Sequence, residues 1–260
     1  IQGIGFYELL DQVVSNYETE KNKLMEKLQE VCSLLFQRQN LLVSVTGGRE
    51  GYAALRNMSD QITDGLYADT EKESIEISLP DQKNEGFKDA SQIQYVSLAG
   101  NYAQSGFSYH GAMRVFKVIM NYEYLWQNIR VKGGAYGCST NVGRNGDVCF
   151  LSYRDPNLER TLEVYRGVTD YLKEFELDER GMTRFVIGAF SELDAPLTPM
   201  SQGRRSLLSY LTGVSYEMIQ KEREQALHTC PQDIRNLAET MQAVLDHSYI
   251  CAIGNEGKLQ

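Results

Sequence analysis

The sequence predicts a protein of the α+β class, with a mostly antiparallel sheet and helices packed mainly on one face of it. Three observations favour this class. Long segments place apolar residues three and four positions apart, which is the spacing of helices that bury one side. The run Arg144-Asn-Gly-Asp147 holds an Asn-Gly pair between two apolar runs, a strong hairpin signal. Tyr249–Ile253 is a short apolar run that fits a last strand of the same sheet.

Composition and charge narrow the functional class. The chain has 260 residues, of which 42% are hydrophobic and 23% charged, as is ordinary for a globular protein. Its formal net charge of −9 argues against a broad nucleic-acid-binding surface. The five cysteines are widely spaced and form no C-x-x-C pair, so we expect free thiols in a reducing compartment.

The sequence shows no targeting or membrane segment. It has no run of about 18 apolar residues, the length that predicts a membrane helix. The chain begins without an initiator Met and shows no secretory signal peptide. We therefore expect a processed product or an excised fragment, with any targeting segment upstream.

The first part of the chain is predicted to be helical with short strands. Residues 5–36 carry an apolar helical stripe and predict one long helix, and residues 51–67 predict a second. Leu41–Val45 predicts a buried strand between them, and residues 74–79 a weaker one. Gly47-Gly48 lacks the spacing of nucleotide-binding glycine motifs, so no nucleotide site is expected there.

A polar run, Asp81–Gly86, reads as a linker and places a domain boundary near residue 85. The prediction is two domains, with residues 1–85 as an incomplete piece and residues 86–260 as a complete α+β domain.

The second domain is predicted to contain both strands and helices, with most of its helices after the hairpin. The lone tryptophan, Trp126, lies on the apolar stripe of a helix ending near Arg130 and is expected to anchor the core. Asp155-Pro156 is expected to begin a helix, with the aspartate as its N-cap. The remaining expected strands are 92–99, 135–142 and 148–153, and the remaining helices are 112–129, 178–192, 200–211, 215–228 and 231–246.

The loop Arg130-Val-Lys-Gly-Gly-Ala-Tyr136-Gly137 joins the end of a helix to the hairpin. Adjacent glycines mark places where the backbone must turn sharply or come close to another group. One interpretation is a helix C-cap and turn that happens to carry an arginine and a tyrosine. The other is a site where the backbone approaches a ligand, flanked by a cation and a phenol.

No self-sufficient catalytic set is visible in the sequence. The three histidines, His110, His228 and His247, lie far apart, and neither H-E-x-x-H nor H-x-x-E-H occurs. G-x-S-x-G is also missing, so no metal ligands and no nucleophile are assigned.

Two motifs resemble a known family. Residues 130–137 with the hairpin and Leu151-Ser-Tyr-Arg-Asp-Pro-Asn157 are similar to the presequence protease subgroup of insulinase/pitrilysin-type zinc metallopeptidases. Phe190–Pro199 resembles a second block of that subgroup. The resemblance covers about residues 90–253, and more weakly residues 1–80. It implies four related domains that close around an unfolded peptide, of which this chain is the end of the third and the whole of the fourth.

The resemblance also implies a function. It predicts a zinc-dependent peptidase that degrades unstructured oligopeptides, with the zinc on a first domain outside this chain. Arg130 and Tyr136 would act as accessory catalytic residues, and Gly133 and Gly134 would join them in binding substrate. The predicted partners are a peptide and the N-terminal half of the enzyme, with no nucleic acid and no membrane. The fragment alone is predicted to be inactive and to bind no metal; the compartment is predicted to be cytoplasmic, with the mitochondrial matrix as alternative.

Two competing functions remain open at this stage. Related folds serve as non-catalytic assembly subunits, and this chain is also compatible with a fragment that has no independent function. The retained Arg130 and Tyr136 favour the catalytic assembly.

Overall fold

The computed structural model describes residues 4–68 and 84–259. The chain forms two compact units, one of Ile1–Ile77 with Leu197–Leu208, the other of Ser78–Pro196 with Ser209–Gln260. None of the helices in the described ranges is long and apolar enough to cross a bilayer. The division into domains at residue 85 stays a prediction.

The first unit consists of helices. Its described elements are α1 (Ile4–Ser15), α2 (Tyr17–Leu35), α3 (Arg49–Asn57), α4 (Ser59–Asp64) and most of α9 (Pro199–Leu211). The expected helix 5–36 is therefore two helices, broken at Asn16, whose side chain donates a hydrogen bond to the carbonyl of Gln12 (3.1 Å). The expected helix 51–67 is likewise split, at Met58.

The expected strand Leu41–Val45 is wrong. These residues pair with no strand in the described part of the first unit, where the sole β-bridge joins Gln37 to Tyr67. Apolar residues in a row fit a strand only if a neighbouring strand can take their backbone hydrogen bonds. The weaker strand expected at 74–79 lies outside the described residues.

The second unit is built on one five-stranded sheet. Its strands lie in the order β1-β5-β2-β4-β3, and β1 runs parallel to β5 while the other neighbours are antiparallel. The predicted mostly antiparallel sheet is thus confirmed. The strands are β1 (Asn84–Asp89), β2 (Gln94–Asn101), β3 (Gly137–Val142), β4 (Asp147–Asp155) and β5 (Tyr249–Asn255).

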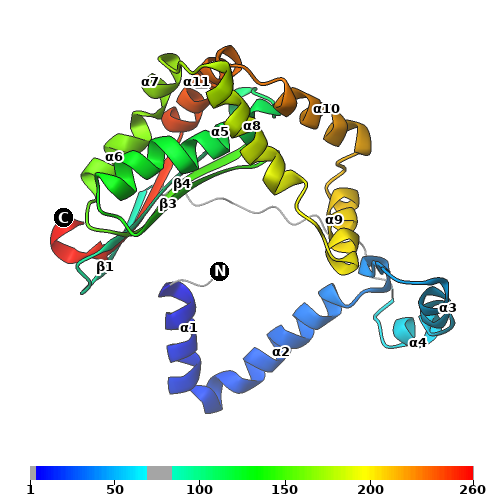
Figure 1. Ribbon diagram of the computed structural model, residues 1–260. Coiled ribbons are helices and arrows are strands. Elements are labelled where there is room, and N and C mark those ends of the chain that lie inside the picture. Colours follow the sequence, from blue (N-terminus) through cyan, green and yellow to red (C-terminus); the bar gives the residue numbers. More distant parts are fainter. Residues whose placement is uncertain (1–3, 69–83, 260) are drawn as a thin grey trace. The chain divides into compact units, whose positions relative to one another are not determined.

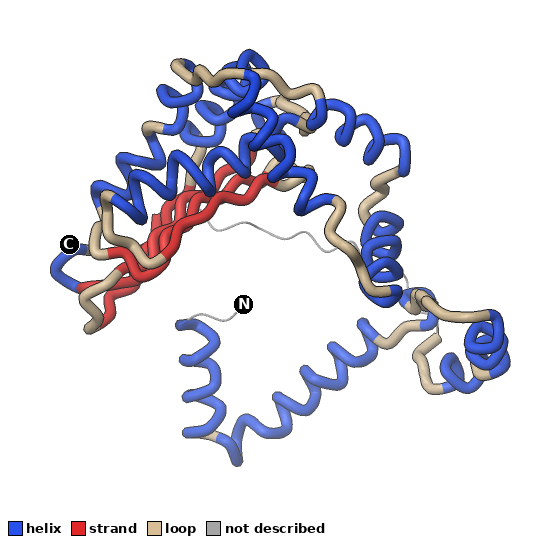
Figure 2. The backbone as a smooth tube through the Cα atoms, viewed as in Figure 1, coloured by secondary structure: helices blue, strands red, loops and turns tan. Residues whose placement is uncertain are grey.

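Helices cover one face of this sheet (Figures 1 and 2). Helices α5, α6 and α11 contact the strands directly, and α8 packs on α5. The helices of the unit are α5 (Ala112–Ile119), α6 (Glu159–Arg166), α7 (Val168–Lys173), α8 (Glu179–Leu193), α10 (Tyr216–Leu227) and α11 (Pro231–Asp246). The core between helices and sheet includes Val96, Leu98, Phe116, Ile119, Leu125, Ile129, Val148, Phe150, Tyr165, Leu172 and Met241.

The helix that begins with α5 changes its winding before it ends. It continues from α5 through two π-helical turns, Met120–Tyr124 and Trp126–Val131. Ile129 stays fully buried, but Trp126 is 37% exposed, so the expectation that it anchors the core is wrong. The wider π winding changes which side chains face the core, and π turns occur often at functional sites.

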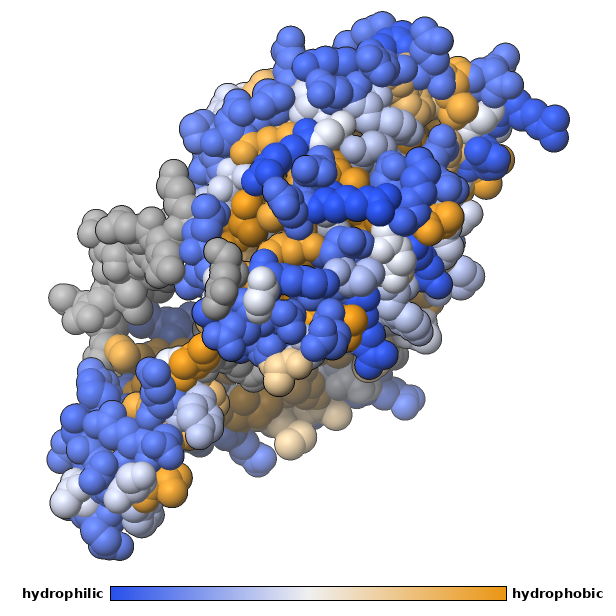
Figure 3. Space-filling model, turned by 90° about the vertical axis from the view of Figure 1, so that its left-hand side faces the viewer, coloured by the Kyte–Doolittle hydropathy of each residue, from blue (hydrophilic) through white to orange (hydrophobic). Residues whose placement is uncertain are grey.

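No helix in the described part of this unit lies over the opposite face of the sheet (Figure 2). Along β2, residues alternate between buried and accessible, as expected for a sheet with one packed face. A hollow of about 440 Å³ lies over this open face, and Tyr95, Ser97, Leu151, Tyr153 and Ile253 help to line it. Large apolar side chains are also exposed elsewhere, and hydrophobic patches reach the surface in Figure 3.

The tip of the β3–β4 hairpin is held to α10 by a buried carboxylate. Glu222 is 7% exposed and accepts hydrogen bonds from Arg144 Nε (2.7 Å) and Nη2 (2.6 Å). Arg114 Nη2 of α5 lies 3.5 Å from the same carboxylate. A bidentate guanidinium–carboxylate pair is among the stronger polar contacts in proteins, so this group fixes the far end of the hairpin.

Candidate functional site

The glycine pair turns the chain sharply between the helix and β3. The amide of Gly134 donates to the carbonyl of Arg130 (2.9 Å), and that of Ala135 donates to Ile129 (3.1 Å). Gly134 has a φ of +80°, a left-handed conformation that glycine adopts without steric cost. A Cβ at Gly133 would lie 2.4 Å from the carbonyl oxygen of Ile129. Glycine is therefore favoured at both positions, by sterics at Gly133 and by backbone conformation at Gly134.

A β-bulge on β4 lies beside this turn. Gln94 of β2 pairs with Asp155, but Val96 pairs with Ser152, so β4 contains one extra residue. Arg154, within the bulge, has a φ of +49°. This left-handed backbone costs a non-glycine residue about 1 kcal/mol. Bulges of this kind redirect side chains and occur often next to active sites.

The bulge returns Asp155 to the packed side of the sheet. Asp155 is fully buried and accepts hydrogen bonds from the Asn157 amide (2.8 Å) and from Thr161 Oγ1 (2.6 Å). The expectation that it caps a helix is wrong, because α6 begins only at Glu159. Its carboxylate instead accepts hydrogen bonds from the loop between β4 and α6 and from α6 itself. These bonds offset the cost of burying the charge.

Three hydrogen bonds tie the glycine turn to the bulge and to α6. The Tyr136 amide donates to the carbonyl of Arg154 (3.3 Å), and Asn157 Nδ2 donates to the carbonyl of Gly133 (2.6 Å). Arg160 Nη1 donates to the carbonyl of Lys132 (3.1 Å). The turn is thus held on both sides by the strand and the helix that follow the hairpin.

Aromatic rings and guanidinium groups alternate around Tyr136. The Arg130 guanidinium lies 4.3 Å from the Trp126 ring and 5.8 Å from the Tyr136 ring. The Arg154 guanidinium lies 5.9 Å from the Tyr136 ring and 5.6 Å from that of Tyr153. These distances are in the range of cation–π contacts, which orient each guanidinium without neutralising it.

The cluster is open to solvent. Tyr136 is 64% exposed, and its ring contacts Tyr153 edge-on with centroids 5.8 Å apart. Tyr153 in turn contacts Tyr95, at 5.3 Å. Interaction with the phenol of Tyr153 and a hydrogen bond to Tyr95 raise the pKa of the Arg154 guanidinium above its ordinary value. The site therefore presents permanent positive charge and a phenol hydroxyl to solvent.

The structure places the predicted residues Arg130, Gly133, Gly134 and Tyr136 on one turn. Sequence reasoning missed Arg154 as a member of the cluster, although it lies in a motif used for the resemblance. No local signal in the sequence marks it, because Arg154 joins the cluster through the shift in the β2–β4 register.

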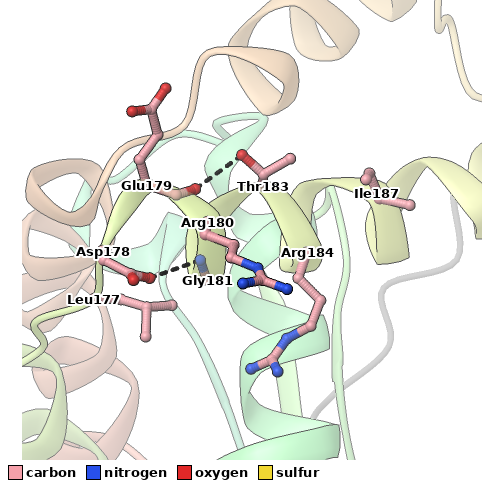
Figure 4. Close-up of a pocket in the computed structure, with 8 residues that line it drawn as sticks. All are labelled: Leu177, Asp178, Glu179, Arg180, Gly181, Thr183, Arg184 and Ile187. Carbon is pink, nitrogen blue, oxygen red and sulfur yellow. Dashed lines mark hydrogen bonds between the residues drawn. The ribbon is translucent and has the colours of Figure 1, made fainter.

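Another hollow of the second unit lies away from this cluster. It measures about 770 Å³ and lies at the start of α8, with Arg180, Arg184 and Ile187 in its wall (Figure 4). Asp178 accepts a hydrogen bond from the Gly181 amide (2.8 Å), as Figure 4 shows, so it already caps this helix. The hollow has no nucleophile–base pair and is not assigned a chemical role.

No metal centre accompanies the arginine–tyrosine cluster within residues 4–68 and 84–259. No group of three His, Cys, Asp or Glu side chains in these ranges could hold a metal ion. His228 uses Nδ1 in a 2.9 Å contact with the carbonyl of Glu224 at the end of α10. What the arginine–tyrosine cluster itself offers is hydrogen-bond donors and positive charge.

A family model, described as the PreP C-terminal domain, matches residues 84–256. The chain belongs to the presequence protease family. This match includes the glycine turn, the hairpin and the bulge, and it confirms the resemblance inferred from residues 130–137 and 151–157.

Curated relatives agree with this assignment. Protein HypA of Clostridium perfringens is 36% identical over 261 residues, which cover all of this chain and 26% of that protein. Presequence protease 1, chloroplastic/mitochondrial, of Arabidopsis thaliana is 29% identical over 97% of this chain and 24% of its own length. The chain thus spans about a quarter of the length of these relatives.

Solved structures share the fold at low sequence identity. A protease from Helicobacter pylori superimposes with a TM-score of 0.59 over 88% of this chain and 58% of its own, at 14% identity. A peptidase M16 inactive domain from Pseudomonas fluorescens gives 0.56 over 78% and 51%, at 15% identity. The fold is that of M16 peptidase domains.

Proposed function

We propose that this chain is the C-terminal part of a zinc-dependent peptidase that degrades unstructured oligopeptides, and that Arg130 and Tyr136 contact its substrate. The observation that carries the proposal is the exposure of Tyr136, on a turn that two glycines, a strand and a helix hold in place. An exposed aromatic ring in so constrained a position contributes little to the core. Its location is better explained by a contact made outside the domain.

The chemistry of peptide hydrolysis suits these two side chains. Attack on a peptide carbonyl places negative charge on its oxygen, and donors already aimed at that oxygen lower the barrier. The hydroxyl of Tyr136 can donate one such hydrogen bond. Arg130, held over Trp126, can orient the substrate backbone through its guanidinium. Gly133 and Gly134 are proposed to join them in binding through the backbone of the sharp turn that only glycines form readily.

The metal is proposed to belong to the N-terminal half of the enzyme. The described residues offer no set of ligands that fits zinc. In the complete enzyme zinc would supply Lewis acidity and an activated water. The role of this chain is to bind and orient the peptide, and we propose that the chain alone hydrolyses none.

The partner and the compartment follow from the same proposal. The N-terminal half of the enzyme is the proposed macromolecular partner. The cytoplasm stays the predicted compartment, with the mitochondrial matrix as alternative. Relatives from Arabidopsis thaliana and Emericella nidulans carry chloroplastic/mitochondrial and mitochondrial in their names.

The test is a pair of substitutions in the complete peptidase. Tyr136→Phe removes one hydroxyl and should lower kcat roughly 10²–10³-fold, the effect of losing one oxyanion donor. Arg130→Ala should lower kcat/KM at least as much, because contacts to both bound substrate and transition state are lost. Tyr122→Phe is the matched control, since Tyr122 is 66% exposed and Tyr136 64%.

The outcomes separate the competing functions. Wild-type turnover in Tyr136→Phe would contradict the proposed contact. A lower Tm with normal turnover would show that the tyrosine serves packing. A complete protein that shows no chelator-sensitive cleavage of any peptide would favour the alternative, a non-catalytic assembly subunit of the same fold.

A further inference from the structure

We propose that Arg154 and Arg130 together bind a carboxylate of the peptide, either its free C-terminus or an acidic side chain. This inference rests on the proposed function in one respect, that the ligand of the cluster is a peptide. It adds a preference for a charge on that peptide, and it adds a specificity residue, Arg154.

The bulge puts Arg154 on the open face of the sheet. Residues of β4 alternate strictly up to Ser152, which is buried, and Tyr153, which is exposed. Regular alternation would turn the next side chain toward the helices. The extra residue instead leaves Arg154 exposed and moves Asp155 inward. The strand thus accepts a left-handed backbone at an arginine, and the effect is to aim that arginine at solvent beside Tyr136.

Neither guanidinium of the cluster has an acidic partner in the described ranges. Arg114, Arg144 and Arg223 each lie within 4.0 Å of a carboxylate, but no such pair involves Arg130 or Arg154. Their contacts described above are the rings of Trp126, Tyr136 and Tyr153 and, for Arg154, a hydrogen bond to Tyr95. What distinguishes this pair is that both guanidinium groups lie within 6 Å of the same phenol ring, that of Tyr136. A guanidinium has five N–H donors, so Arg154 keeps donors beyond the one bonded to Tyr95, and both side chains can bind a carboxylate, which they match in geometry.

The neighbouring surface favours a peptide carboxylate over a phosphate group. Tyr153 belongs to both the arginine cluster and the wall of the 440 Å³ hollow on the sheet. Leu151 and Ile253 give that hollow apolar walls. A peptide can place an apolar side chain there and the adjacent carboxylate at the arginines, whereas a free phosphate would use only the arginines.

Trp126 provides a direct assay on this 260-residue chain. It is the one tryptophan of the sequence, and its ring lies 4.3 Å from the Arg130 guanidinium. The chain is titrated with three probes while tryptophan emission is followed. The probes are N-acetyl-Ala-Ala-Leu as the free acid, the same peptide as its C-terminal amide, and N-acetyl-Ala-Leu-Glu as its amide.

The free acid should bind about tenfold more tightly than its amide, as expected for gaining a charge-assisted hydrogen-bond pair. The Glu-containing amide distinguishes the two sources of the carboxylate. Binding as tight as that of the free acid shows that side-chain carboxylates are accepted, and binding as weak as that of the plain amide limits the site to the C-terminus.

Arg154→Gln should abolish the difference between acid and amide. Arg154→Asn should do the same, and because asparagine tolerates a left-handed backbone, its effect cannot come from backbone strain. Arg180→Gln, an exposed arginine on α8, is the control with the same loss of charge and should keep the difference.

Two results would overturn this inference. One is equal affinity for the free acid and its amide. If Arg130→Ala then weakens the binding of both peptides, the substrate contact proposed for Arg130 is retained and only the carboxylate preference fails. The other is an acid preference that persists in both Arg154 variants. Failure of the proposed function has a different signature, because it appears as unchanged turnover of Tyr136→Phe in the complete enzyme.

Discussion

Glu222→Gln tests how strongly the hairpin tip is held to α10. The substitution keeps the shape of the side chain but replaces one acceptor oxygen by an amide that itself donates. In the native protein Oε1 accepts from Arg144 Nε at 2.7 Å, and Oε2 accepts from Nη2 at 2.6 Å. One of the two positions in the variant would therefore bring two donors face to face.

The expected loss is about 2 kcal/mol in the free energy of unfolding. A hydrogen bond to a charged group contributes roughly 1.5–3 kcal/mol. The value is taken near the lower end, because the Arg144 side chain is 34% exposed and water can hydrate it once its partner is lost. For a domain of this size, 2 kcal/mol corresponds to a decrease in Tm of about 4–8 °C.

Trp126 makes the assay specific for the second unit. Its emission in a urea titration follows the unfolding of that unit, even if the two units unfold separately. Glu224→Gln, an exposed glutamate two positions away on the same helix, is the control and should change stability by less than about 0.5 kcal/mol. If Glu222→Gln were as harmless as this control, the buried pair would not contribute to stability, and the argument from its geometry would be refuted.

Two further predictions concern stability. Gly133→Ala should lower the free energy of unfolding by about 2 kcal/mol or more, because its Cβ would meet the Ile129 carbonyl oxygen at 2.4 Å. Gly134→Ala should lower it by only about 1 kcal/mol, the cost of a left-handed backbone at alanine. Equal losses in urea unfolding would contradict this ranking. Burial raises the pKa of Cys138 from 9.0 to about 11 and that of Tyr102 from 10.0 to about 12. The unfolded chain then releases these protons from about pH 9 upward while the folded chain keeps them, so the free energy of unfolding should fall as pH rises past 9, and a flat profile would show that these groups are not buried in solution.

Much of the second unit could be predicted from its sequence because local patterns and tertiary contacts agree there. The Asn-Gly pair at residues 145–146 marks the hairpin, and the apolar stripe of residues 231–246 predicts α11. The expected helix 112–129 begins correctly with α5 but ends in two π-helical turns. The first unit was predicted less well. Leu41–Val45 has the composition of a strand, but pairing depends on a partner strand, which composition cannot reveal.

The candidate site was predictable only in part. The glycine pair with Arg130 and Tyr136 is contiguous in sequence, so a pattern can identify it. Arg154 joins the cluster through a bulge, and a bulge is visible only when the register of two strands is known. The same shift explains the error at Asp155, whose position before a proline is typical of a helix start but whose side chain is drawn inward by the extra residue.

The order of the strands has a consequence for how the protein is made. Asn84 on β1 accepts a hydrogen bond from the Ile250 amide on β5, 166 positions later in the chain. While a ribosome synthesises the protein, β1 must therefore wait, unpaired, until almost the whole second unit has emerged. An exposed strand edge invites pairing with other nascent chains, and charged residues discourage it. The sequence of β1, Asn-Glu-Gly-Phe-Lys-Asp, carries three charges in six residues. The same polar residues that predict a linker from sequence therefore protect β1 from pairing with other chains until β5 has been synthesised.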